Sequence, residues 1–129
     1  MKQIPKWKLE KIFNAFGTKV TLHVVTKTIV DDQFGQAEES EADHTILVDI
    51  QDIGADELMM YPEGMIQEGD LWVIMLPIYT IDGEDIIPKE NDYITFKNDK
   101  YLIAGFEDDI QNGNIVSRRA IARRQVVNG

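Results

Sequence analysis

The fold of this chain is decided by residues 61–109, YPEGMIQEGDLWVIMLPIYTIDGEDIIPKENDYITFKNDKYLIAGFEDD. Three short runs of β-branched and aromatic residues alternate here with turn residues, a pattern typical of antiparallel strands. We expect strands at Leu71–Tyr79, Asp92–Lys97 and Lys100–Phe106, a turn at Asn98-Asp99, and an acidic loop at residues 82–91. The stretch contains many carboxylates between its strands but no histidine, serine or cysteine.

Both flanks of this stretch predict further strands. Lys19–Val30 and Thr45–Ile53 alternate apolar and polar residues, which predicts a long hairpin with an acidic tip. Asn112-Gly113 is the strongest turn signal in the chain, because both residues tolerate positive φ, and it predicts a last strand at Ile115–Val127. The strand at residues 71–79 is apolar on both faces, and Pro77 indicates an edge at its end. We therefore predict a mainly β fold, a small antiparallel β-barrel or sandwich of about six strands.

Two short helices are expected beside the strands. Residues 5–16 form one apolar face at helical spacing through Leu9, Ile12, Phe13 and Phe16. Residues 55–61 predict one or two helical turns between the second and third strands, ended by Pro62. The 129 residues are expected to form one domain. Its parts are an N-terminal helix at 1–17, a β-barrel core at 18–110 with an acidic loop at 31–44, and a C-terminal strand and basic tail at 111–129.

Charge is segregated along the chain, which has a net charge of -10. Residues 1–30 carry six lysines and one acid, residues 31–70 carry thirteen acids and no base, and residues 111–129 carry four arginines and no acid. An acidic body repels phosphate backbones, which disfavours duplex binding. Basic ends and an acidic middle suit docking of one copy against another or against a neighbouring protein. A soluble acidic protein whose termini are basic has the same profile.

Composition argues against several other classes of protein. A hydrophobic content of 43% and a charged content of 28% are ordinary globular values, so wholesale disorder is not expected. The sequence contains no run of eighteen apolar residues, so we expect no membrane span. The absence of cysteine excludes disulfides and thiolate metal sites, and it fits a chain that matures in a reducing cytoplasm.

The polar clusters match no catalytic, cofactor-binding or metal-binding motif. The acids around Gly83 lack the spacing of a calcium loop, and no companion motif supports catalysis by a carboxylate pair. His23 and His44 stand alone, as surface or internally satisfied histidines do. No glycine-rich phosphate loop is present. We therefore expect no catalytic residue, no cofactor and no bound metal.

Two arginine pairs near the C-terminus, Arg118-Arg119 and Arg123-Arg124, allow two interpretations. Alternation on a strand places Arg119 and Arg123 on one face and the other two on the opposite face. They protect an edge strand by charge, or they form a basic surface that meets the acidic loops of a neighbour or DNA in a channel.

The order of these elements resembles the head-closure (stopper) or head-tail connector proteins of the tailed-bacteriophage neck. Proteins of this kind share a glycine before the first strand, an aromatic-glycine pair in the next loop, a second strand, a Glu-Leu helix ending in Pro-Glu-Gly, a Gly-Asp opening, an Asp-x-Ile strand and a Tyr-led return strand. The matching elements are Gly17, Phe34-Gly35, Thr45–Ile53, Glu57-Leu58, Pro62-Glu63-Gly64, Gly69-Asp70, Asp92-Tyr93-Ile94 and Tyr101-Leu102-Ile103. The resemblance covers residues 17–109 and rests on order and spacing.

This resemblance implies a structural protein of a phage or prophage neck and not an enzyme. The implied assembly is a homo-oligomeric ring that bridges the portal complex and the tail and retains packaged DNA. Its partners would be other copies of the chain, a portal or adaptor protein on the head side, and a tail-joining or tail-terminator protein on the tail side, with packaged DNA met only in passing. The implied location is the virion neck, after assembly in the host cytoplasm. Alternatives are another head-tail adaptor or tail-joining protein, or an OB-like nucleic-acid-binding barrel.

By the same resemblance, the long loop between the first two strands is the channel or stopper loop. An acidic loop suits a lumen through which DNA must pass without adhering. Its candidate residues are Asp31, Asp32, Phe34, Gly35, Glu38, Glu39, Glu41 and Asp43. The candidate assembly contacts lie at the ends of the chain and are Trp7, Phe13, Phe16, Arg118, Arg119, Arg123 and Arg124.

Overall fold

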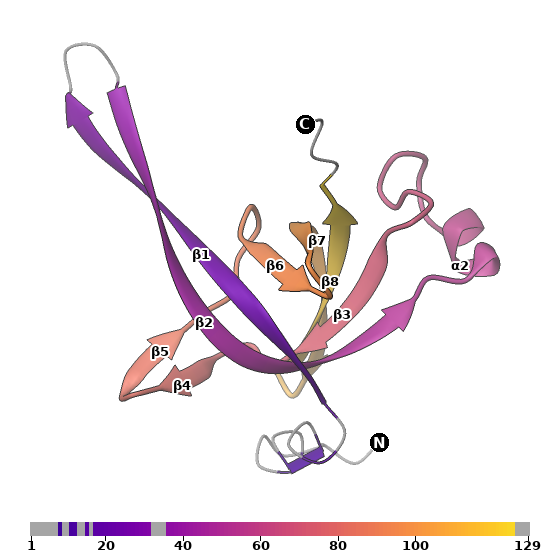
Figure 1. Ribbon diagram of the computed structural model, residues 1–129. Coiled ribbons are helices and arrows are strands. Elements are labelled where there is room, and N and C mark those ends of the chain that lie inside the picture. Colours follow the sequence, from indigo (N-terminus) through magenta and orange to yellow (C-terminus); the bar gives the residue numbers. More distant parts are fainter. Residues whose placement is uncertain (1–7, 9–10, 13–14, 16, 32–35, 126–129) are drawn as a thin grey trace.

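A closed antiparallel barrel with the strand order β1-β2-β3-β8-β7-β6 forms the body of the protein (Figure 1). The computed structural model describes residues 8, 11–12, 15, 17–31 and 36–125. The barrel strands are β1 Thr18–Asp31, β2 Gln36–Asp52, β3 Leu71–Met75, β6 Tyr93–Phe96, β7 Asp99–Gln111 and β8 Asn114–Arg124. Outside the barrel order lie α2 Ala55–Met60 and a two-stranded hairpin of β4 Tyr79–Ile81 and β5 Glu84–Ile86. The predicted mainly β barrel, with a short helix between the second and third strands, is confirmed.

Alternate residues of the six barrel strands fill the interior, as the period of a strand requires. The buried apolar side chains that the strands contribute are Val20, Leu22, Ile46, Val48, Val73, Met75, Ile94, Ile103, Ala120 and Ala122. Large residues on β1, β2 and β3 therefore pack with two alanines of β8, which lets the walls of a small barrel approach each other.

β3 is buried on both faces, as its unbroken apolar run predicts. Val73 and Met75 belong to the barrel core, whereas Trp72 packs with Ile66 and Ile121 in a second cluster. Leu58 of α2 lies against this second cluster, so the helix and the loop after it cover the outer face of the strand. The predicted edge at Pro77 is wrong, because β3 ends at Met75 and pairs with β2 and β8.

The acidic loop expected at residues 31–44 is wrong for most of its length, because residues 36–44 belong to β2. Within the antiparallel pair, Glu39 lies opposite Lys27 and Asp43 lies opposite His23. The Lys27 Nζ and Glu39 Oε1 atoms are 3.4 Å apart, so cross-strand charges offset the poor strand propensity of the acids. Residues 32–35, and with them the candidates Asp32, Phe34 and Gly35, lie outside the described residues.

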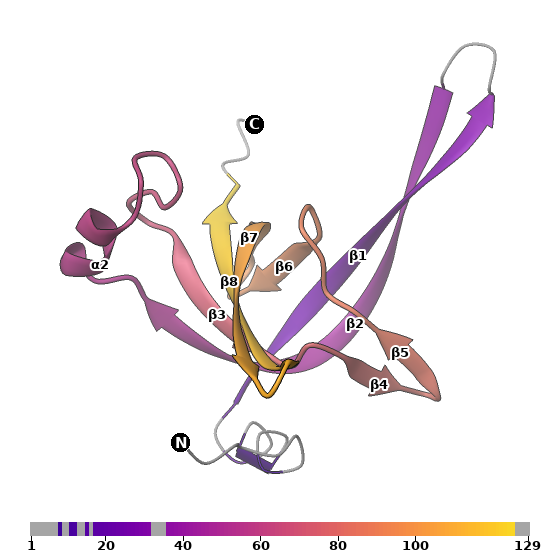
Figure 2. The same ribbon diagram turned by 180° about the vertical axis from the view of Figure 1, so that it is seen from behind.

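The outer part of this hairpin forms no strand pairs with the rest of the barrel. β1 pairs with β6 only over Thr21–His23, and β2 pairs with β3 only over Asp49–Asp52. Residues 24–31 and 36–42 pair only with each other among the described residues, and we call them the arm. Figures 1 and 2 show the arm extending well past the barrel.

Three hairpins end in two-residue turns with positive φ, the geometry that matches the twist of paired strands. Asn112 and Gly113, with φ of 53° and 80°, join β7 to β8 at the predicted position. The turn between β6 and β7 lies at Lys97-Asn98, one residue before the predicted Asn98-Asp99. Part of the acidic loop expected at residues 82–91 is instead the β4–β5 hairpin, whose turn is Asp82-Gly83.

At the N-terminal end, Lys8, Lys11, Ile12 and Ala15 are helical and exposed. The other positions of the helix expected at residues 5–16 lie outside the described residues, including Trp7, Phe13 and Phe16. No helix in the described part of the chain is long and apolar enough to cross a membrane.

Candidate interaction surfaces

β8 carries the four arginines, and it is not an edge strand. It pairs with β3 on one side and with β7 on the other, so charge protection of an open edge does not explain its composition. The Arg118 Nε atom donates to Asp108 Oδ1 at 2.8 Å, and its Nη1 donates to the Pro88 carbonyl at 2.9 Å. The guanidinium also stacks 3.8 Å from the ring centre of Phe106. Arg118 therefore links β8 to β7 and to the loop after β5.

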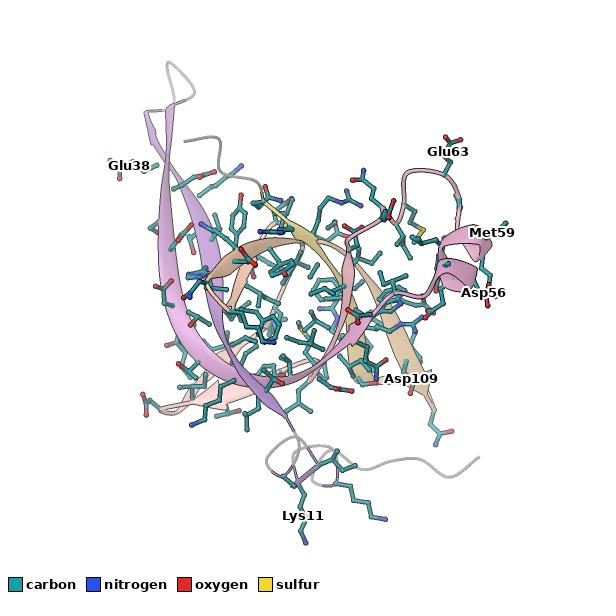
Figure 3. The ribbon with its side chains drawn as sticks, turned by 45° about the vertical axis from the view of Figure 1, so that its right-hand side comes forward. Lys11, Glu38, Asp56, Met59, Glu63 and Asp109 are labelled. Atoms are coloured by element: carbon teal, nitrogen blue, oxygen red, sulfur yellow. The ribbon has the colours of Figure 1, made fainter. Side chains whose placement is uncertain are left out.

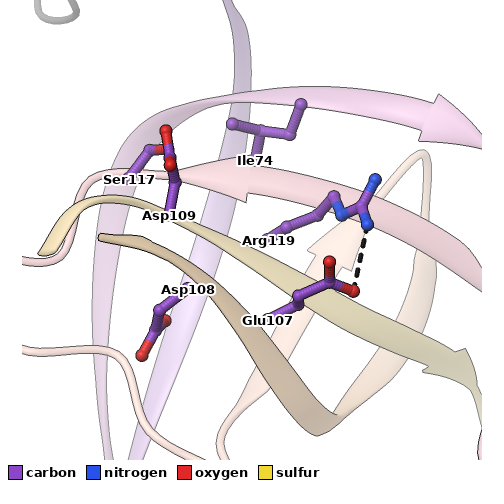
Figure 4. A pocket seen from close by; sticks show the side chains of 6 residues that line it. All are labelled: Ile74, Glu107, Asp108, Asp109, Ser117 and Arg119. Atoms are coloured by element: carbon purple, nitrogen blue, oxygen red, sulfur yellow. Dashed lines mark ion pairs between the residues drawn. The ribbon is translucent and has the colours of Figure 1, made fainter. Parts of the chain in front are cut away.

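Arg119 lies on the opposite face, at the centre of a second network. Its Nη2 is 3.0 Å from Glu107 Oε2 (Figure 4). The same Nη2 donates to the Tyr61 hydroxyl at 3.1 Å. Its guanidinium lies 3.9 Å from the ring centre of Trp72, whose indole N–H donates to Glu57. Tyr61 in turn donates to Glu107 at 2.6 Å. These contacts join the end of α2, β3, β7 and β8.

The electrostatics of this network favour an ionised carboxylate. The hydrogen bond from Tyr61 is the main cause that lowers the pKa of Glu107, and the bond from Arg119 acts in the same direction. The same bond to Glu107 raises the pKa of the Tyr61 phenol. A general acid needs a carboxyl group whose pKa is raised, so Glu107 has the wrong shift for that role.

Arg123 and Arg124 complete the set. Arg123 forms a two-point contact with Asp70, with donor–acceptor distances of 3.2 and 3.0 Å, and the Asp70 side chain is almost completely buried. Arg124 Nη2 lies 3.2 Å from Asp99 Oδ1 at the surface. Every arginine of this chain thus has a carboxylate partner within the same chain, which leaves little unpaired positive charge on β8.

Sequence reasoning missed these pairs, although a signal for them was present. Glu107 and Asp108 stand before the Asn112-Gly113 turn, and Arg118 and Arg119 stand after it at nearly symmetric spacing. The pairs Asp109–Ser117 and Ile110–Ile115 leave Val116 as an extra residue in β8. This bulge shifts the register by one, so that Glu107 faces Arg119 and Asp108 faces Arg118. The turn alone would have predicted a register that differs by one residue, because a bulge adds one residue to one strand and the turn does not reveal it.

A shallow pocket of about 300 Å³ lies beside the Arg119 network (Figure 4). Its lining residues are Ile74, Glu107, Asp108, Asp109, Ser117 and Arg119. Two of the carboxylates, those of Glu107 and Asp108, already bind arginines. The pocket is open, and most of its lining residues are charged, whereas small-molecule sites are typically enclosed.

His23 lies at the base of the arm, where β1 leaves β6. Its Nδ1 is 2.7 Å from Asp43 Oδ1, and its Nε2 is 2.6 Å from the Thr95 hydroxyl. Glu41 Oε2 lies 3.9 Å from the ring, and Lys100 Nζ lies 3.3 Å from the other oxygen of Glu41. His23, Glu41 and Asp43 are close enough to hold a metal ion, but each already has a partner in the chain. This is the internally satisfied histidine that one of the two sequence interpretations described.

β2 carries four of the candidate channel residues, three of them in the arm. Glu38, Glu39, Glu41 and Asp43 are exposed on β2, with Glu38 on one face and the other three on the opposite face. Figure 3 shows Glu38 projecting outward on the far part of the arm. The structure therefore presents these acids on a paired strand and not on an irregular loop.

Comparison with known proteins identifies the fold. No protein-family model and no curated protein matches the sequence. Among solved structures, the chain is similar to the solution structure of protein SF1141 from Shigella flexneri 2a, at 14% sequence identity and a TM-score of 0.57. The match covers 82% of this chain and 89% of that chain. At this identity, the similarity shows the fold alone.

Proposed function

We propose that this protein is a structural subunit of the neck of a tailed phage or prophage, where copies form a head-closure or head-tail connector ring. The arm is the observation that carries this proposal. Closure of the barrel uses only Thr21–His23 of β1 and Asp49–Asp52 of β2 outside their mutual pairing, so the arm is not needed to complete the sheet. In a ring, each subunit contributes one arm, so that arms reach the channel from every side.

The charge on the arm fits a channel for DNA. Glu38, Glu39 and Glu41 are exposed, and a ring repeats them at the level of each arm. Carboxylates repel the phosphate backbone, so the arms narrow the channel without holding DNA by attraction. A basic projection of the same length would bind DNA and oppose its exit.

The alternative of a nucleic-acid-binding barrel receives less support. Such barrels combine a basic groove with exposed stacking rings. Here all four arginines bind carboxylates of the same chain, and two of them cover the rings of Phe106 and Trp72. In this proposal the protein is not an enzyme, and its partners are further copies, a portal or adaptor protein and a tail-joining or tail-terminator protein, with DNA passing through.

Shortening the arm tests the proposal. Residues 27–39 are replaced by Asn-Gly, so that Thr26 and Ser40, which are paired across the strands, flank a two-residue turn. We expect the shortened variant to have the same urea midpoint of unfolding as the wild-type protein. Phage particles assembled with this variant should lose DNA or lack tails. Particles with normal DNA content and normal tails would refute the role given to the arm. A matched variant with Glu38 and Glu39 changed to glutamine separates the effect of charge from that of length.

A further inference from the structure

Three of the five methionines are exposed within one short segment of the chain, residues 59–65. Met59 and Met60 end α2 with exposed fractions of 87% and 80%, and Met65 follows in the next loop and is half exposed. By contrast, Met75 in β3 is completely buried. We call Met59, Met60 and Met65 the methionine surface. Figure 3 shows Met59 pointing away from the barrel, on the same side of the molecule as Asp56 and Glu63.

The methionine surface is held in a fixed position by the opposite side of its own segment. Leu58 packs against the cluster of Ile66, Trp72 and Ile121, and Glu57 accepts a hydrogen bond of 2.9 Å from the Trp72 indole. The helix is therefore anchored to the barrel, and its exposed methionines are not needed for that anchoring. Flexible, polarisable methionine side chains are common where a protein binds an apolar helix face.

Acidic residues flank the methionine surface along the sequence. Asp56, Glu63 and Glu68 are exposed, and none of them forms an ion pair with another residue in the described parts of the chain. An apolar centre with a negative rim selects a partner that is apolar along one face and positively charged beside it.

The N-terminal segment of this chain has that chemistry. Its sequence MKQIPKWKLEKIFNAF carries four lysines and one acid, with an apolar stripe at helical spacing. Within it, Lys8, Lys11, Ile12 and Ala15 are helical, and Ile12 is 48% exposed. Figures 1 and 2 both place the described helical residues well away from α2 of the same chain.

We infer that the methionine surface binds the basic N-terminal helix of a second copy of this chain. Because the two surfaces differ, the contact is heterologous and repeats head to tail, which closes into a ring when the rotation between copies allows it. The inference deepens the proposed function and rests on it for ring closure. The pairing of two copies stands on the apolar surfaces and the charges alone.

The absence of cysteine allows a direct test by cross-linking. An Ile12→Cys chain is mixed with a Met59→Cys chain under mild oxidation, and the mixed disulfide dimer is measured by non-reducing electrophoresis. We expect it to form about tenfold faster or more than with an Ile87→Cys chain, since docking raises the effective concentration of the two thiols. Ile87 is also an exposed apolar residue, but it lies outside the methionine surface. Charge reversal by Asp56→Lys with Glu63→Lys, or added salt, should slow the reaction.

Three results would overturn the inference. The first is mixed dimer formation at the same rate with Met59→Cys and Ile87→Cys. The second is an internal disulfide in the monomeric double variant Ile12→Cys/Met59→Cys with no link in the mixture, which would place the helix on its own chain. The third is unchanged linking after charge reversal. If the mixed disulfide forms but phage particles with the shortened arm are normal, the contact between copies is supported and the proposed neck function is refuted. If the mixed disulfide does not form but those particles lose DNA or lack tails, only the contact between the methionine surface and the N-terminal helix is refuted.

Discussion

Replacement of Asp92 by alanine should loosen the seam between β1 and β6, where the barrel closes. These strands pair at only three positions, from Thr21 to His23 on β1. Asp92 directly precedes β6, and its Oδ1 atom accepts the N–H of Val25 at 3.0 Å, two residues beyond the last pair. The side chain thus continues the hydrogen bonds of β1 at the point where β6 has ended.

The structure sets the size of the expected effect. Asp92 has 0% exposure, and its Oδ2 atom also accepts the backbone N–H of Lys89 at 3.1 Å. Alanine leaves both backbone donors without an acceptor, at a cost of about 1–3 kcal/mol for each. The Lys89 ammonium, which donates to Oδ1 at 2.6 Å, is half exposed and regains water at little cost. The free energy of unfolding should therefore fall by about 2–6 kcal/mol.

Urea denaturation followed by circular dichroism measures this loss in Asp92→Ala, Asp92→Asn and Asp85→Ala. Asparagine keeps one acceptor oxygen and should give an intermediate value. Asp85 lies on the exposed β4–β5 hairpin, and its replacement should change the unfolding free energy by less than about 0.5 kcal/mol. Amide exchange at Val25 should accelerate first in Asp92→Ala. Equal stability of Asp92→Ala and Asp85→Ala, with Val25 still protected, would refute the role of Asp92 in the seam.

Two further predictions concern buried polar groups. Arg123→Ala should lower the free energy of unfolding by about 3–5 kcal/mol, because Asp70 stays buried without its partner. Arg124→Ala should lower it by only about 0–1 kcal/mol, because its partner Asp99 is partly exposed. Equal urea midpoints for the two variants would contradict this prediction. Burial raises the pKa of Tyr79 above its ordinary value of 10.0, so the stability from its neutral form is complete below that pH and is lost as pH rises, when the unfolded chain ionises first. Tyr79→Phe should be less stable at neutral pH but lose less stability above about pH 10, and an unchanged alkaline slope in melting experiments would contradict the assignment.

Features of the fold that depend on local sequence could be predicted. Alternation marked the β1 and β2 residues that face the interior, and Asn112-Gly113 marked the last hairpin, because positive φ is encoded by residue type. Pro62 placed the end of α2 correctly for a similarly local reason. β4 and β5 were missed because three residues are too few to show a period, although Asp82-Gly83 is a recognised hairpin turn.

Features that depend on register and distant partners could not be read in this way. The acids of the arm were expected in a loop because their strand propensity is low, and the compensating Lys27 and His23 become visible only when β1 and β2 are aligned. Burial of Asp92 depends on the Val25 N–H, 67 residues away in the sequence. The partners of Arg118 and Arg119 likewise depend on a bulge in β8. Because these side chains are charged, the sequence alone suggested that they are exposed to solvent.

The central claim is that copies of this chain form a ring in a phage neck with their arms in the channel. An electron cryomicroscopy reconstruction of the neck of tailed particles whose genome encodes the chain tests it most directly. The proposed function predicts a ring of closed six-stranded barrels between the portal complex and the tail, with the β1–β2 arm of each subunit directed toward the axis. A neck without these barrels, or a ring whose arms all point away from the channel, would contradict it.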